Sequence, residues 1–177
     1  MTPPSRTGQG IHIDEAAATF SYKRDLDAPR ELVFEAWSTC EHLRRWFGPA
    51  GWTLPVCELD FRPGGRWRYG MQGPDGSMSH GLMVYGAIEP PARIEYTDYF
   101  TDEHGTIDHA MPVSTTVLEL HDLGEGRTRL ASTTRYARPE DLRTVLGFGA
   151  EAGLVETLDR LAEHLRSHQA REGSTTS

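Results

Sequence analysis

The stretch Leu26–Pro49, LDAPRELVFEAWSTCEHLRRWFGP, predicts two short amphipathic helices with a defined start and stop. Pro29 suits a first helical turn, because the N–H that proline lacks would have no partner there. Ser38, with Glu41 three residues later, fits a capping box that starts the second helix. The Gly-Pro pair that closes the stretch then ends it. Helices this short are unstable alone, so we expect them to pack against a sheet.

Strand patterns surround this stretch on both sides. One strand is expected over about 17–26, before the helices, and six more follow them over about 54–61, 66–71, 78–88, 93–100, 113–121 and 127–136. Turn residues such as Pro63-Gly64 and the tetrapeptide 73–76 separate neighbouring strands. In segment 93–100, Ile94, Tyr96, Asp98 and Phe100 occupy one face of the strand. The sequence therefore predicts about seven antiparallel strands.

A long amphipathic helix follows the strands. Acidic residues open this last element, and its leucines then recur at helical spacing through Leu154, Leu158, Leu161 and Leu165. Consecutive strands with segregated helices indicate the α+β class. We expect the sheet to curve around the long helix and to leave a cavity between them.

Length and composition indicate one domain over residues 17–167, with a flexible leader over 1–16 and a flexible tail over 168–177. The chain has no run near the ~18 apolar residues of a membrane span and no signal-peptide core. Cys40 and Cys57 lack metal or redox spacing. We therefore expect reduced thiols in a cytoplasmic protein.

The net charge of −8 is concentrated in one region. Residues 73–126 hold ten acidic residues and a single basic one, Arg93, while the rest of the chain is close to neutral. Because phosphate binding needs a basic surface, this distribution argues against a nucleic-acid partner.

Two motifs and three single residues suggest binding or catalytic chemistry, and the two motifs have simpler interpretations. The segment 147–152, GFGAEA, matches a dinucleotide fingerprint but does not follow a first strand, so no cofactor is expected. The His- and Asp-containing loop over 102–109 lacks metal-ligand spacing, so no metal site is expected. No nucleophile elbow occurs. Asp98, Glu119 and His80 are weak acid–base candidates, which would matter only if they face the cavity.

Four segments of the sequence resemble a known protein family. RDLDAPRELVFEAWSTCEHLRRWFGP, CELDFRPGGRWRY, EPPARIEYTDYF and AGLVETLDRLAEHL resemble the activator-of-Hsp90-ATPase C-terminal-like family, in the START/Bet v 1-like (SRPBCC) superfamily. The resemblance covers about residues 17–167 and implies a helix-grip fold. Two positions depart from the family pattern: Leu154 stands where a Trp is usual, and Ala87 where a Glu is common. Both changes are expected to favour a larger or more apolar cavity.

The leading functional hypothesis is binding of a small hydrophobic or aromatic molecule, such as a lipid, polyketide or antibiotic-like metabolite, without catalysis. Alternatives that the superfamily suggests are a polyketide cyclase or aromatase using the same cavity, and a co-chaperone-like interaction domain. The family resemblance also allows the protein to form a homodimer. Aromatic side chains supply large apolar contact areas. The expected ligand-binding residues are Trp37, Trp46, Phe47, Trp67, Tyr69, Met83, Tyr85, Tyr96, Phe100, Gly149, Gly153 and Leu154.

Overall fold

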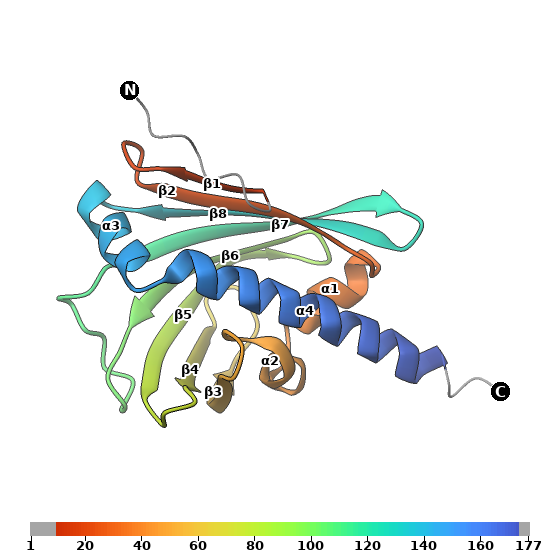
Figure 1. Cartoon of the computed structure of the whole chain (residues 1–177), viewed down its shortest axis with the longest axis horizontal. Coiled ribbons are helices and arrows are strands. Elements are labelled where there is room, and N and C mark those ends of the chain that lie inside the picture. Colours follow the sequence, from red (N-terminus) through yellow and green to blue (C-terminus); the bar gives the residue numbers. More distant parts are fainter. Residues whose placement is uncertain (1–9, 174–177) are drawn as a thin grey trace.

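The computed structural model describes residues 10–173 and contains one sheet and four helices (Figure 1). The strands are β1 Ile11–Asp14, β2 Thr19–Leu26, β3 Thr53–Leu59, β4 Arg66–Gln72, β5 Met78–Glu89, β6 Arg93–Phe100, β7 Ser114–Gly124 and β8 Arg127–Tyr136. The helices are α1 Arg30–Ala36, α2 Cys40–Trp46, α3 Pro139–Gly147 and α4 Ala150–Gly173. No helix within 10–173 is long and apolar enough to cross a membrane.

The eight strands form one antiparallel sheet in the order β1-β2-β8-β7-β6-β5-β4-β3. The sheet curves, and α4 lies across its face, with α3 towards one end and α1 and α2 towards the other (Figure 1). This arrangement confirms the expected α+β helix-grip fold. It contains one strand more than predicted, because residues 11–14 pair with β2 from Ile11↔Tyr22 to Asp14↔Thr19. The prediction of a flexible leader is therefore wrong for these residues, and its first nine lie outside the described range.

The second short helix begins one residue later than the capping box predicted. Thr39 is the N-cap, and its side-chain oxygen accepts a hydrogen bond from the backbone N–H of His42 at 3.3 Å. Ser38 instead finishes the turn after α1, where its hydroxyl donates to the carbonyl of Glu35 at 2.9 Å. Both residues have capping chemistry, and the extended backbone of Thr39 decides between them.

The last helical segment is divided into two. Gly149 lies between α3 and α4 with a φ of +82°, a left-handed conformation that glycine adopts without strain and that interrupts the helix. Phe148, next to it, is 62% exposed. Beyond this break α4 continues to Gly173, so the expected tail is helical from residue 168 to residue 173, and residues 174–177 lie outside the described range.

The core lies between the sheet and the middle of α4. Leu158, Leu161 and Leu165 are buried against it, in the stripe that the sequence predicted. On the same helix, Arg160 donates through Nη1 to the carbonyl oxygens of Gly48, Pro49 and Trp52, at 2.8, 3.1 and 3.2 Å. These bonds fasten the loop after α2 to the long helix.

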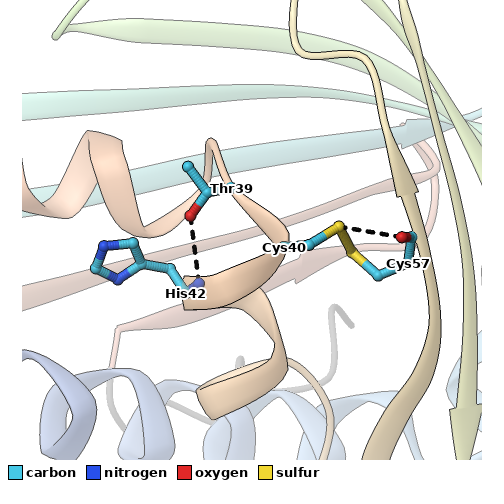
Figure 2. The surroundings of a disulfide bond; sticks show 4 residues. All are labelled: Thr39, Cys40, His42 and Cys57. Carbon is cyan, nitrogen blue, oxygen red and sulfur yellow. Dashed lines mark hydrogen bonds between the residues drawn. A yellow bond between two sulfur atoms is a disulfide. The ribbon is translucent and has the colours of Figure 1, made fainter.

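A disulfide between Cys40 and Cys57 joins the start of α2 to β3 (Figure 2). The expectation of reduced thiols is therefore wrong. The two residues are 17 positions apart, and their Cα atoms come within 6.0 Å because α2 packs against β3. That packing is a tertiary contact, so the spacing of the two cysteines in the sequence does not indicate it.

Histidines from two helices meet at the outer side of the contact between α2 and α4. The rings of His42 and His164 are buried, and His42 Nδ1 lies 2.8 Å from His164 Nε2. The ring of His168 lies 5.2 Å from that of His42. Charged groups from both helices surround the cluster, and a surface hollow there is lined by Glu41, His42, Arg45, His164, His168, Arg171 and Glu172.

The disulfide should stabilise the fold by limiting the freedom of the unfolded chain. Replacing both cysteines by serine (Cys40→Ser with Cys57→Ser) is expected to lower the free energy of unfolding by about 3 kcal/mol, the loop-closure value for this spacing. Urea denaturation measures it. Reductant should lower the stability of the unsubstituted protein similarly and leave the double variant unchanged. A protein indifferent to reductant would contradict the prediction.

The histidine cluster should make stability depend on pH. Burial lowers the pKa of His164 to about 4, and the neighbouring His42, His168, Arg171 and Arg45 act in the same direction. From pH 6.5 down to 4, the unfolded chain binds a proton at this position that the folded chain excludes, so stability falls as the pH falls.

Urea denaturation of the unsubstituted protein and of His164→Gln at pH 7, 6 and 5 tests this dependence. The loss of stability towards low pH should be smaller in the variant, because the variant lacks the excluded proton. Other titrating groups contribute to both proteins, so the difference between the two curves is the informative quantity. Parallel curves would show that His164 is not responsible.

Candidate ligand-binding site

A cavity of about 400 Å³ lies between the sheet, α3 and the first part of α4. Its size falls within the ~300–1,000 Å³ of small-molecule sites. Most of its walls are apolar or aromatic. The lining residues are Phe20, Tyr22, Trp37, Trp46, Phe47, Gly48, Pro49, Tyr69, Met71, Ser79, His80, Met83, Tyr96, Asp98, Phe100, Ser132, Thr134, Tyr136, Leu142, Val145, Leu146, Phe148, Gly149, Ala150, Gly153, Leu154, Thr157 and Leu158.

Small residues at the junction of α3 and α4 and in the first turn of α4 explain why this end of the helix leaves space. Gly149, Ala150 and Gly153 all line the cavity, and none carries a side chain larger than a methyl group. Leu154 also lines it, at the position where the resemblance described above implies a Trp. The smaller side chain leaves volume beneath the helix. Ala87, the other departure, is exposed and outside the lining, so it does not affect the cavity.

Ten of the twelve expected ligand-binding residues line the cavity, and Trp67 and Tyr85 do not. Trp67 is 1% exposed and packs against Phe47 and Tyr69, with ring centroids 4.7 and 4.8 Å away. Tyr85 packs against Phe61 at 5.1 Å. Both rings form the layer behind the lining. Strand alternation in the sequence did not say which faces point inward, and it could not give the distance of each ring from the cavity.

Sequence reasoning missed the contribution of β2, β8 and α3. From these elements come Phe20, Tyr22, Ser132, Thr134, Tyr136, Leu142, Val145 and Leu146. The alternation of Phe20 and Tyr22 was visible, but it did not say which face of the strand points inward. The pairs Phe20↔Thr134 and Tyr22↔Ser132 place four of these residues on the same face of the sheet.

Asp98 and Tyr69 form the polar centre of the cavity wall. The Tyr69 hydroxyl donates a hydrogen bond to Asp98 Oδ1 at 2.8 Å. A glycine on the neighbouring strand makes room for this phenol, since a Cβ atom at Gly81 would lie 2.2 Å from Tyr69 Oη. Gly81 therefore permits the hydrogen bond between the tyrosine and the carboxylate.

Burial raises the pKa of Asp98 to about 7, although hydrogen bonds from Tyr69 and from the backbone N–H of Tyr99 partly oppose the shift. Asp98 is partly buried and lines the cavity. Burial, with the nearby charge of Asp98, raises the pKa of Tyr69 well above its ordinary value. The proton of the pair therefore stays on Tyr69, and Asp98 titrates near neutral pH.

His80 and Glu119, the other acid–base candidates, do not join this pair. Gly70 and His80 are paired across β4 and β5, and a Cβ atom at Gly70 would lie 2.9 Å from His80 Nδ1. Because successive side chains alternate, the imidazole lies on the opposite face of the sheet from Tyr69. Glu119 has a side chain that is 44% exposed, lies 3.8 Å from His121, and does not line the cavity.

The other two motifs also have places in the structure. The glycine-containing segment 147–152 spans the junction of α3 and α4, without a preceding strand that would make it a dinucleotide loop. In the loop after β6, Asp102 Oδ1 accepts from the backbone N–H groups of His104 and Thr106, both at 2.9 Å. Within residues 10–173, no three His, Cys, Asp or Glu side chains are arranged to hold a metal ion.

Comparison with known proteins agrees with this architecture. Residues 27–166 match the family described as activator of Hsp90 ATPase homolog 1-like protein. No curated protein matches the chain.

Solved structures similar to this chain come from several bacteria. A protein from Arthrobacter aurescens is 30% identical, with 89% of this chain and 91% of that one covered and a TM-score of 0.82. A protein from Mycobacterium smegmatis is 28% identical, with coverage of 88% and 94% and a TM-score of 0.80. A third, from Nitrosomonas europaea, is 28% identical, with coverage of 89% and 99% and a TM-score of 0.76. Folds of this kind commonly bind hydrophobic ligands. The chain therefore belongs to the activator of Hsp90 ATPase homolog 1-like family, within the Bet v 1-like (SRPBCC) superfamily.

Proposed function

We propose that this protein binds a small, mainly apolar molecule in the cavity between the sheet and α4, and that binding does not convert the molecule. The observation that carries the proposal is a cavity of about 400 Å³ with largely apolar and aromatic walls. Such a volume is costly to leave unfilled, because the lining atoms lose their packing partners. A lipid, polyketide or antibiotic-like metabolite with a flat or flexible apolar body suits these walls.

A second candidate function is acid–base catalysis on the bound molecule, as in a polyketide cyclase or aromatase. One observation favours it: Asp98 and Tyr69 meet at the cavity wall, and the Asp98 carboxyl group has a pKa of about 7. A group that titrates near neutral pH can both accept and return a proton.

A protein-interaction function like that of a co-chaperone has less support. It would favour a filled interior and an exposed apolar patch. The large apolar side chains that are exposed within residues 10–173 come from four separate segments: Met78, Val113, Leu123 and Phe148.

A bulky substitution at Leu154 tests the binding function. Leu154→Trp should fill part of the cavity and weaken binding of the neutral fluorescent probe N-phenyl-1-naphthylamine by roughly tenfold or more. Fluorescence titration measures binding, and thermal unfolding checks the fold. Ala152→Trp is the matched control, because it adds the same ring to the exposed side of α4. An unsubstituted protein without saturable binding, or equal binding by both variants, would refute the proposal.

Mass spectrometry distinguishes binding from catalysis. If the cavity only binds, small molecules that the purified protein captures from a cell extract should be recovered unchanged after incubation. If Asp98 acts as an acid or base, a product should accumulate, and Asp98→Asn should slow its formation by about a hundredfold or more. A product formed equally fast by both proteins would exclude Asp98 from the reaction.

A further inference from the structure

The cavity contains one carboxyl group that has no cationic partner among the described residues that line it. Among its lining residues in the described chain, Asp98 is the single carboxylate, and no Lys or Arg lines the cavity. His80 contributes to the lining, but its imidazole lies on the far side of the sheet, over Gly70. No ion pair within residues 10–173 involves Asp98, whereas most buried carboxylates in proteins are paired.

Aromatic side chains line the same cavity as this carboxylate. Tyr69 donates its hydroxyl to Asp98, and Tyr96 and Tyr136 line the same cavity. Tyr96 lies two residues before Asp98 on the same face of β6, and Tyr136 is paired with Ser114, the residue paired with Asp98 on β7. Aromatic faces attract cations through their quadrupole, most strongly where water is excluded. A carboxylate among aromatic rings is therefore a favourable environment for an organic cation.

We propose that the ligand of this cavity is a lipophilic amine, bound as its ammonium ion against Asp98 with its apolar part directed towards α3 and α4. This proposal rests on the binding function proposed above and specifies the chemical class of the ligand. The ammonium N–H groups would donate to the Asp98 carboxylate, a charge-assisted hydrogen bond. The apolar body would contact residues such as Leu146 and Leu154, which line the opposite wall.

The same arrangement disfavours other head groups. An anionic ligand would place a second negative charge beside Asp98, and no lining Lys or Arg is available to receive it. A neutral alcohol could accept or donate a hydrogen bond, but it would not balance the charge. Selectivity should therefore follow the order ammonium, hydroxyl, carboxylate for ligands that share one apolar body.

Binding of an ammonium ion should also depend on pH. The empty cavity holds Asp98 with a pKa of about 7, so only part of the protein carries the charged form near neutral pH. A bound cation stabilises the ionised carboxylate. The affinity for an amine should rise from pH 6 to pH 8, as long as the amine itself stays protonated, while the affinity for a neutral alcohol should change little.

Three probes with one ring system test the proposal: 1-naphthylmethylamine, 1-naphthalenemethanol and 1-naphthaleneacetate, the carboxylate anion of 1-naphthaleneacetic acid. Isothermal titration calorimetry at pH 8 should give an affinity for the amine about tenfold or more above that for the alcohol, since hydrogen bonds to charged groups are the stronger ones. The acetate should bind more weakly than the alcohol.

Two variants that each remove one negative charge test whether the preference for the amine depends on Asp98. Asp98→Asn keeps an acceptor for the Tyr69 hydroxyl and removes the charge, so it should bind the amine no more tightly than the alcohol. Glu119→Gln removes one negative charge from the same sheet outside the cavity, and it should bind all three probes like the unsubstituted protein. Thermal unfolding at pH 8 checks the fold, and Asp98→Asn should melt no lower than the unsubstituted protein, because it no longer buries an ionised group.

The outcomes separate this proposal from the more general one. Binding of the alcohol as tight as that of the amine, or an unchanged preference in Asp98→Asn, would overturn the amine assignment and leave hydrophobic binding intact. If none of the three probes binds and N-phenyl-1-naphthylamine also fails to bind, both proposals are refuted. A preference for the amine that disappears only in Asp98→Asn supports the assignment.

Discussion

The attachment of the middle of α4 to the sheet and to the loop after α2 makes the rest of this structure possible. Leu161 and Leu165 are buried against the sheet, and Arg160 holds the loop after α2 through three carbonyl oxygens. Towards its N-terminal end, the helix presents glycine and alanine to the sheet and begins at a left-handed Gly149. A helix packed closely along its full length would fill the interior. Here the packed middle of the helix supplies stability, and its first turns, with small side chains, cover an unfilled space.

The carboxylate in that space shows how stability and binding oppose each other. An ionised Asp98 is unfavourable in an apolar cavity, and this unfavourable energy raises its pKa. The folded protein could avoid the problem with an asparagine of nearly the same shape. A bound cation would relieve it as well, so the energy that destabilises the empty cavity favours a ligand of suitable charge. The hydrogen bond from Tyr69, for which Gly81 makes room, keeps the carboxylate in place.

Much of the fold and part of the cavity lining could be predicted from local sequence patterns. Most of the features that could not be predicted share a physical cause. Alternation in segment 93–100 placed Asp98 on a face with Tyr96 and Phe100, and leucine spacing identified the long helix. Those signals arise within one element. The disulfide, the strand at 11–14, and the position of Trp67 behind the lining depend on contacts between elements distant in sequence. The wrong N-cap prediction is different: two adjacent residues had similar chemistry, and backbone geometry chose between them.

The disulfide makes the shape of the cavity depend on the redox conditions around the protein. Cys40 begins α2 and is bonded to Cys57 in β3 (Figure 2). Trp46, at the other end of α2, and the following Phe47 line the cavity wall. The shape of that wall is therefore tied to the oxidation state of two sulfur atoms outside it. Thermodynamic linkage makes the relation reciprocal. Whatever factor the disulfide contributes to the affinity for a ligand, a bound ligand contributes equally to the resistance of the disulfide to reduction.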